Sequence, residues 1–451
     1  MTTASRPRPP SVEQVLVTVR ARAGAVGRAH DALVEVVRTV LDEERSRLLA
    51  GAPAATIDEL ARAALDRLAE MDGPGIQAAI NATGVIVHTN LGRAPWPSAA
   101  SEAVAALASG YLLLELDRTS GRRGARFRLA EDHLIALTGA EDALITNNNA
   151  AAVALAVGLA GRAGVAVSRG ELVEIGGGVR IPEIIRRAGA RLVEVGTTNR
   201  TRAEDFREPL ESGRARLVLR VHRSNFRQDG FTEDPDAAAV AAIAHEHGAL
   251  VVDDLGSGAL IDTAPFGLAH EPLPAERLAA GSDVVTFSGD KLVGGPQAGL
   301  IVGRADAIAR IRRDPLARAM RPDKATLVGV AATLGLYRAG RAAEIPVWRM
   351  IGARPDDLRA RAAALAERVG GRVTELRSTV GGGSLPGETL PSWGVVVSAR
   401  ATRLLDALRA GTPPVIARID AGAIVLDVRT VDPALDTDLA AAVERALAAT
   451  R

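Results

Sequence analysis

Between about Leu129 and Gly303, short apolar runs of strand length alternate with stretches of helical length. We expect strands at ALIT, VAVS, RLVEV, RLVLRV and ALVV, and helices from Asn149, near Ile181 and over Ala238 to His245. Such a succession is typical of a mostly parallel sheet with helices on both faces. Ligands of these sheets bind at the carboxyl ends of the strands. We therefore expect the functional side chains in the polar and glycine-rich loops that follow the strands.

Two further regions flank this α/β segment. Apolar positions at helical spacing from about Ser11 to Met71 predict a helical N-terminal domain over residues 1–75, which ends at the breakers in 71–75. A large domain is expected over residues 76–325. After about Ala325, VVVSA, PVIARID and AIVLDV are strand candidates between helical segments, so a smaller α/β domain is expected over residues 326–451.

Composition limits the class of protein. A chain of 451 residues that is 47% hydrophobic can bury large cores, and a formal net charge of +1 gives no general attraction to DNA or anionic membranes. The absence of cysteine excludes disulfides, thiolate metal sites and cysteine nucleophiles. The N-terminus lacks the apolar run of a signal peptide, and no apolar stretch reads as a membrane span. We expect a cytoplasmic protein without a membrane or DNA partner.

Lysine occurs only at positions 291 and 324, so 53 of the 55 basic residues are arginine. A guanidinium group cannot be deprotonated at useful pH and cannot form an imine with an aldehyde, whereas a lysine amine desolvated in a pocket can. A retained lysine is therefore a candidate for covalent chemistry. Composition alone is equally consistent with two lysines that survive by chance.

Lys291 stands in a loop that follows a predicted strand. Asp283–Phe287 predicts the strand, and Ser288–Gly295 predicts the loop. Ser288 can offer its hydroxyl to a cofactor phosphate, while the glycines at 294 and 295 permit a tight turn. This pattern favours pyridoxal phosphate held as a Schiff base on Lys291.

Asparagines open the alanine-rich helix that follows ALIT. Asn148 and Asn149 stand where backbone N–H groups at a helix N-terminus can bind a phosphate, and the alanines after them leave it room. Ordinary capping of the helix by asparagine is the alternative.

Two aspartates end the strand LVVDD. A carboxylate at this place can keep the pyridine nitrogen of the cofactor protonated, which makes the ring an electron sink. The glycines of LGSG leave space for a flat ring. Either Asp253 or Asp254 could supply this carboxylate, and a capping or salt-bridging role remains open for both.

The chain resembles the bacterial selenocysteine synthase family, the L-seryl-tRNA(Sec) selenium transferases, within the aspartate-aminotransferase fold type (fold type I) of pyridoxal-phosphate enzymes. The resemblance covers nearly the whole chain. It is carried by INATGVIVHTNLGRAP, SGRRGARF, ITNNNAAAV, SRGELVEIGGGVRIPEI, VGTTNRT, VHRSNF, DLGSG, FSGDKLVGGPQAG and DPLARAMRPDK.

This resemblance implies an enzyme that removes water from the serine of seryl-tRNA(Sec), which leaves a dehydroalanyl group, and then adds selenium from selenophosphate. Lys291 would be the Schiff-base lysine and the proton shuttle. The resemblance also favours Asp254, which stands next to LGSG, as the aspartate at the pyridine nitrogen. Arg93, Arg318 and Arg321 would bind the selenium donor, which agrees with the paired hydrogen bonds that guanidinium groups make to phosphate-like oxygens. Arg318 and Arg321 would share one face if their segment is helical.

Other implied features have weaker support from the residues. His222 and Asn225 could line the cofactor, although a structural histidine is equally plausible. Arg123 and Arg126 could serve the substrate, a neighbouring subunit or local ion pairs. The resemblance also implies an assembly of dimers that complete each other's active sites and join into a ring of ten chains.

The N-terminal helices would dock the tRNA, although eight arginines face six acids in residues 1–50 and acids outnumber bases in residues 51–75. Two other functions stay open. One is a related pyridoxal-phosphate lyase that acts on a small amino acid, and the other is a non-catalytic RNA-binding scaffold.

Overall fold

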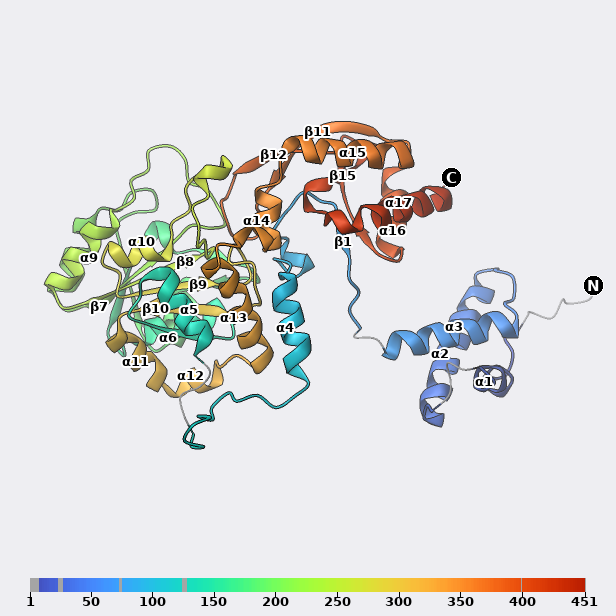
Figure 1. Ribbon diagram of the computed structural model, residues 1–451, viewed down its shortest axis with the longest axis horizontal. Helices are drawn as coiled ribbons and strands as arrows, with labels where there is room; N and C mark the ends of the chain where they lie inside the picture. Colours follow the sequence, from blue (N-terminus) through green and yellow to red (C-terminus); the bar gives the residue numbers. More distant parts are fainter. Residues whose placement is uncertain (1–7, 23–26, 73–74, 124–127, 399, 451) are drawn as a thin grey trace, which may run out of the picture. The chain divides into compact units, whose positions relative to one another are not determined.

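A computed structural model describes residues 8–22, 27–72, 75–123, 128–398 and 400–450 (Figure 1). The chain divides into two compact units, residues 1–79 and 80–451. The domain boundaries expected at residues 75 and 325 stay predictions, and helix α13 (Lys324–Arg338) runs through the second of them.

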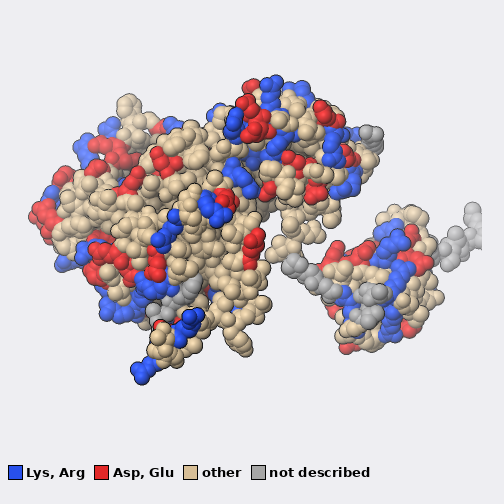
Figure 2. Space-filling model, viewed as in Figure 1, with Lys and Arg blue, Asp and Glu red and all other residues tan. Residues whose placement is uncertain are grey.

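The N-terminal unit contains the expected helices, α1 (Val12–Arg20), α2 (His30–Leu49) and α3 (Ile57–Asp72). Ser11 begins α1 with a capping box, in which its side chain accepts from the Gln14 N–H and the Gln14 side chain accepts from the Ser11 N–H. Apolar positions at helical spacing form the core of this unit, including Val19, Val37 and Leu68. Figure 2 shows basic and acidic side chains intermixed on its visible face.

The second unit is built around a seven-stranded sheet of order β2-β10-β9-β8-β7-β3-β6. Strand β10 runs antiparallel to both of its neighbours, and the remaining pairs are parallel, which confirms the expected mostly parallel sheet. The strands are β2 (Asp142–Thr146), β3 (Gly164–Ser168), β6 (Arg191–Val195), β7 (Ala215–Val221), β8 (Leu250–Gly256), β9 (Val284–Ser288) and β10 (Gly299–Gly303).

Helices cover both faces of this sheet because successive side chains of its buried strands point to opposite sides. Val284 packs with α6 (Asn149–Gly158), α7 (Ile181–Arg187) and α11 (Ala305–Arg313), whereas Val285 packs with α5 (Leu129–Thr138), α13 and α14 (Pro346–Ile351). The other helices of this region are α4 (Ser98–Ala108), α8 (Arg207–Glu211), α9 (Ala237–Glu246), α10 (Pro274–Ala279) and α12 (Pro315–Ala319).

An antiparallel sheet of order β11-β12-β15-β14 follows in the chain. Its strands are β11 (Arg372–Thr379), β12 (Thr389–Val397), β14 (Arg418–Asp420) and β15 (Ala423–Asp427), and it packs with α15 (Pro355–Val369), α16 (Ala401–Ala410) and α17 (Asp436–Thr450). The pairs β1 (Ile80–Asn81) with β13 (Val415–Ile416), and β4 (Glu174–Ile175) with β5 (Val179–Arg180), complete the strands.

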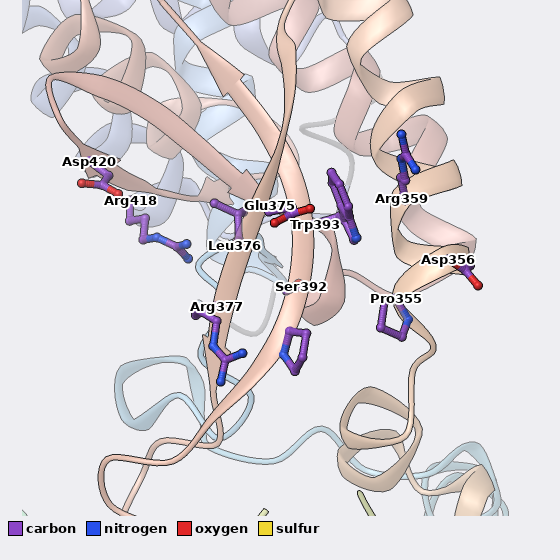
Figure 3. Close-up of a pocket in the computed structure, with 11 residues that line it drawn as sticks. Pro355, Asp356, Arg359, Glu375, Leu376, Arg377, Ser392, Trp393, Arg418 and Asp420 are labelled. Atoms are coloured by element: carbon purple, nitrogen blue, oxygen red, sulfur yellow. The ribbon is translucent and has the colours of Figure 1, made fainter. Parts of the chain in front are cut away.

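A cavity of about 780 Å³ lies on this smaller sheet (Figure 3). Arg359 stands over the ring of Trp393, with its guanidinium carbon 5.0 Å from the ring centre. The rest of the lining includes Arg377, Arg418 and the acids Asp356, Glu375 and Asp420, and Arg377 donates to Thr389. The cavity includes none of the residues predicted to form the site.

Candidate active site

The carboxyl edge of the large sheet holds a cavity of about 550 Å³, lined from the ends of β2, β7, β8 and β9. It brings together every residue predicted for catalysis and cofactor binding, and also Arg93. These lining residues are Arg93, Asn148, Asn149, His222, Asn225, Asp254, Ser288 and Lys291. The position agrees with the general rule for ligand sites in parallel sheets.

Lys291 lies in the connection between β9 and β10. Within the described part of the chain, its Nζ makes no hydrogen bond or ion pair, so the amine is available to a ligand. Burial lowers the pKa of Lys291, and the neighbouring Asp254 acts in the opposite direction. The chain comes close at Gly383, where φ is 77° and an added Cβ would stand 2.9 Å from Nζ. A side chain at Gly383 would crowd the amine.

Asp254 is the aspartate of the LVVDD pair that lines the cavity. Its Oδ1 accepts hydrogen bonds from Asn149 Nδ2 at 2.8 Å and from Thr286 Oγ1 at 3.0 Å. Burial raises the pKa of this carboxyl group, while both hydrogen bonds and Lys291 lower it. Asp253 points to the other face of β8, where Ser282 Oγ donates to it at 2.5 Å.

The two asparagines at the start of α6 have different roles. Asn148 caps the helix, because its Oδ1 accepts from the Ala151 N–H at 2.9 Å, so the capping alternative describes its side chain. Asn149 Oδ1 is buried and finds no hydrogen-bond partner in the part of the chain that the structure describes. The first N–H groups of α6 have no partners within the helix, as at any helix start.

Ser288 is the last residue of β9 rather than the first of the loop, and it is buried.

His222 lies against a buried acid. Its Nδ1 is 3.6 Å from Glu271 Oε1, and both atoms are buried without a hydrogen-bond partner among the described residues. Burial lowers the pKa of His222 to about 4 and raises the pKa of Glu271. His222 is therefore neutral at physiological pH. Asn225 donates through Nδ2 to the Glu174 carbonyl at 2.7 Å, which ties it to the β4–β5 hairpin.

Arg93 enters the cavity from a strained backbone. Its φ is 66°, a backbone conformation that residues other than glycine rarely adopt. Arg93 Nη1 donates to Asp290 Oδ2 at 2.7 Å, whereas Asp290 Oδ1 is buried and has no hydrogen-bond partner within the described ranges. The sequence neighbour of Lys291 thus holds an arginine beside the lysine.

Arg318 and Arg321 do not line the cavity. Helix α12 ends at Ala319, so Arg321 lies beyond it, and the condition under which both arginines would share one helical face is not met. Arg318 is exposed, and Arg321 Nη1 lies 3.4 Å from Glu115 Oε1. Arg123 pairs with the same glutamate at 2.5 Å, whereas Arg126 lies outside the described residues.

Several lining residues were not predicted. Gly382 and Gly383 belong to a glycine run that is typical of any turn. Thr89, Ser224, Asp290 and Gln297 lie within segments that carry the family resemblance, and that membership is the signal that could have identified them. These residues become recognisable because distant loops meet at one edge of the sheet.

The cavity fits pyridoxal phosphate. It combines an amine without a partner, a buried carboxyl group, the N-terminus of α6 beside a serine hydroxyl, and an unpartnered amide oxygen on Asn149. In the ranges that the structure describes, no group of three or more His, Cys, Asp or Glu residues could hold a metal ion. None of the described helices is long and apolar enough to cross a membrane.

Comparison with known proteins identifies the family of this chain. The family model of L-seryl-tRNA selenium transferase matches residues 79–432. The chain is 43% identical to the L-seryl-tRNA(Sec) selenium transferase of Rhizobium meliloti, over 93% of each chain. It is 41% identical to that of Carboxydothermus hydrogenoformans, over 94% of this chain and 93% of the relative.

Among solved structures, D-glucosaminate-6-phosphate ammonia-lyase matches with a TM-score of 0.61 at 22% identity, over 83% of this chain and 97% of that one. This match, together with the sheet described above, confirms the predicted aspartate-aminotransferase-like fold class. The length and identity of the sequence matches place the chain in a single family: it belongs to the L-seryl-tRNA selenium transferases.

Proposed function

We propose that this chain converts seryl-tRNA(Sec) to selenocysteinyl-tRNA(Sec) with pyridoxal phosphate as cofactor and selenophosphate as selenium donor. The observation that carries the proposal is the position of Lys291, whose unpartnered amine shares the cavity with Asp254 and Asn149 in a chain of this family. When bound, pyridoxal phosphate supplies an electron sink for the bonds at Cα of the substrate amino acid.

Each residue of the cavity has its own role in holding the cofactor. Asp254 would hold the ring nitrogen of the cofactor protonated. Asn148, Asn149 and Ser288 would hold its phosphate, where the N-terminus of α6 favours negative charge. His222 and Asn225 would line the cavity beside the ring.

Lys291 removes the α-proton of the serine. Its lowered pKa leaves a larger neutral fraction of the amine at physiological pH, as a general base requires. The same amine then returns a proton when the selenium has been added. Asp254 acts in the opposite direction and raises the pKa of this amine.

Arg93, Arg318 and Arg321 bind the selenium donor. Arg93 is already held in the cavity by Asp290. The other two lie outside the cavity of their own chain, so we assign them to the cavity of a partner in a dimer. Five such dimers would form a ring of ten cytoplasmic chains, with the N-terminal unit binding the tRNA.

The test supplies purified protein with pyridoxal phosphate, seryl-tRNA(Sec) and selenophosphate. The expected product is selenocysteinyl-tRNA(Sec), detected after hydrolysis of the ester. Independently of activity, addition of the cofactor should produce a visible absorbance band, and borohydride should fix the cofactor on Lys291. Conversion of free serine with the acylated tRNA untouched would instead identify a small-substrate lyase, and absence of the band would support the scaffold.

A further inference from the structure

The loop between β9 and β10 rests on one face of helix α13. Gly329, Thr333 and Tyr337 stand at every fourth position of this helix, so they lie on the same face. A Cβ added at Gly329 would stand 2.6 Å from Pro296 Cγ, and one added at Gly295 would stand 2.9 Å from Thr333 Oγ1. The backbone of the loop is therefore packed directly against this face.

Tyr337 makes a polar contact between this face and the loop. Its hydroxyl donates to the carbonyl oxygens of Leu292 and Val293, each at 3.0 Å. These two residues directly follow Lys291 in the chain. The same hydroxyl accepts a hydrogen bond of 2.5 Å from Trp348 Nε1 on α14. A chain of hydrogen bonds thus runs from α14 through α13 to the backbone next to Lys291.

The hydroxyl of Tyr337 lies in the hydrophobic core. Tyr337 and Trp348 are 7% and 2% exposed, and both belong to the core cluster that contains Leu292 and Val293. The other tyrosine of the chain, Tyr111, is fully exposed. Burial raises the pKa of Tyr337, so the hydroxyl keeps its proton and donates at physiological pH. A phenylalanine would fill almost the same space, so what the tyrosine adds is the bond to the loop.

We propose that Tyr337 is a positioning residue for Lys291: its hydroxyl fixes the backbone after the lysine and thereby directs the amine into the active-site cavity. Tyr337 does not line that cavity, so it acts through the loop. Leu292 N donates to the Ser257 carbonyl at 3.0 Å and holds the same backbone from β8. An amine held in this way meets an aldehyde in one orientation, which speeds formation of the bond. This inference rests on the proposed function, in which Lys291 binds pyridoxal phosphate.

The experiment compares the wild type with Tyr337→Phe as full-length proteins. The first measurement follows the visible absorbance band after pyridoxal phosphate is added to the cofactor-free protein. In Tyr337→Phe the band should develop about ten- to a hundredfold more slowly, because the amine is no longer held in position to react. In the conversion assay, kcat should fall by a similar factor. The KM for seryl-tRNA(Sec) should change little, since Tyr337 lies outside the cavity.

Thr138→Val is the matched control, because it also removes a buried hydroxyl that donates to a main-chain carbonyl. Thr138 is 5% exposed, and its Oγ1 donates to the Leu134 carbonyl at 2.7 Å on α5, a helix that does not line the cavity. Urea unfolding should show lower stability for both variants, but only Tyr337→Phe should delay the band. If Tyr337→Phe does not fold, Trp348→Phe takes its place, since it removes the donor to the phenol oxygen and should delay the band in the same direction.

Equal rates of band formation in wild type and Tyr337→Phe would overturn the inference and would leave Tyr337 a role in stability alone. An equal delay in Thr138→Val would also overturn it, because the delay would then follow from lost stability. The wild type separates the two proposals. A wild type that forms the band but no selenocysteinyl-tRNA(Sec) contradicts only the proposed function, and the rate of band formation still decides the inference. A wild type without the band contradicts both.

Discussion

Asn149 Nδ2 donates a hydrogen bond of 2.8 Å to Asp254 Oδ1, which joins the first residue of α6 to the end of β8. Thr286 donates to the same oxygen. Among the described residues no hydrogen bond reaches Asp254 Oδ2, so this oxygen remains available for a ligand. This hydrogen bond therefore fixes the position of Asn149, at the phosphate end of the proposed cofactor site, relative to Asp254 at the ring end.

Replacement of the two adjacent aspartates by asparagine should separate their roles. Asp254→Asn should lower the rate of conversion by about 10²-fold or more, because an amide cannot hold the ring nitrogen protonated. Asp253→Asn should retain most activity, since its side chain binds Ser282 on the other face of β8. Single-turnover rates and the absorbance spectrum measure both. Equal losses would show that the cavity does not distinguish the aspartates.

Lys291→Ala should lose the visible absorbance band and lower conversion by about 10²- to 10⁴-fold or more, because both the covalent link and the proton shuttle are removed. Lys324→Ala is the matched control, since that amine donates to the Gly110 carbonyl at 2.7 Å and does not line the cavity. Peptide mapping after borohydride reduction provides the readout. A cofactor adduct on Lys324 would contradict the assignment.

The stability of the cofactor-free protein should depend on His222 below neutral pH. Its pKa is lowered from 6.5 to about 4 by burial, so the unfolded chain takes up a proton at a higher pH than the folded one. Stability is therefore lost as the pH falls from 6.5 towards 4, by roughly 3 kcal/mol for this group. Urea unfolding of wild type and His222→Gln should show a smaller loss in the variant. Parallel pH profiles would exclude a buried neutral histidine.

Mixed oligomers test whether Arg318 and Arg321 act in a partner's cavity. The Lys291→Ala variant and the double variant Arg318→Ala, Arg321→Ala should each be inactive alone. Re-association of an equal mixture should restore about a quarter of wild-type activity, since half of the dimers are mixed and each has one intact site. Failure to recover activity would place the arginines in their own chain's site or outside catalysis.

Removal of the N-terminal unit separates tRNA binding from cofactor binding. A chain that starts at Ile80 should keep the absorbance band, because the cavity is formed only by residues of the second unit. Its affinity for tRNA(Sec) should fall by about tenfold or more, with a weaker dependence on salt, if the helices contact phosphates. Unchanged affinity and salt dependence would assign the helices another role.

Sequence reasoning predicts those features that local pattern determines. The valine-rich runs of β3, β7 and β8 and the start of α6 at Asn149 match the expected elements, and an isolated lysine after a strand identified the cavity. Strand β11 was not predicted, because RVTELRST is largely polar and most of its side chains are exposed or half-buried.

The remaining features depend on contacts between distant segments. Nothing in the local sequence indicates that Gly383 approaches Lys291, or that Glu271 lies against His222. The helical spacing of Arg318 and Arg321 was misleading because the segment leaves the helix at Ala319, before the second arginine.

The connection between β9 and its antiparallel neighbour β10 holds the backbone that carries Lys291. The connection from β9 to β10 is closed by hydrogen bonds from Gly289 N to Ala298 O and from Gly295 N to Gly289 O, both 2.9 Å, so the backbone of Lys291 is anchored at its base. Displacement of Nζ within the cavity must therefore come from rotation about the bonds of its own aliphatic side chain. If Lys291 holds the cofactor as proposed, its amine would stay within one side-chain length of the site while the substrate is bound.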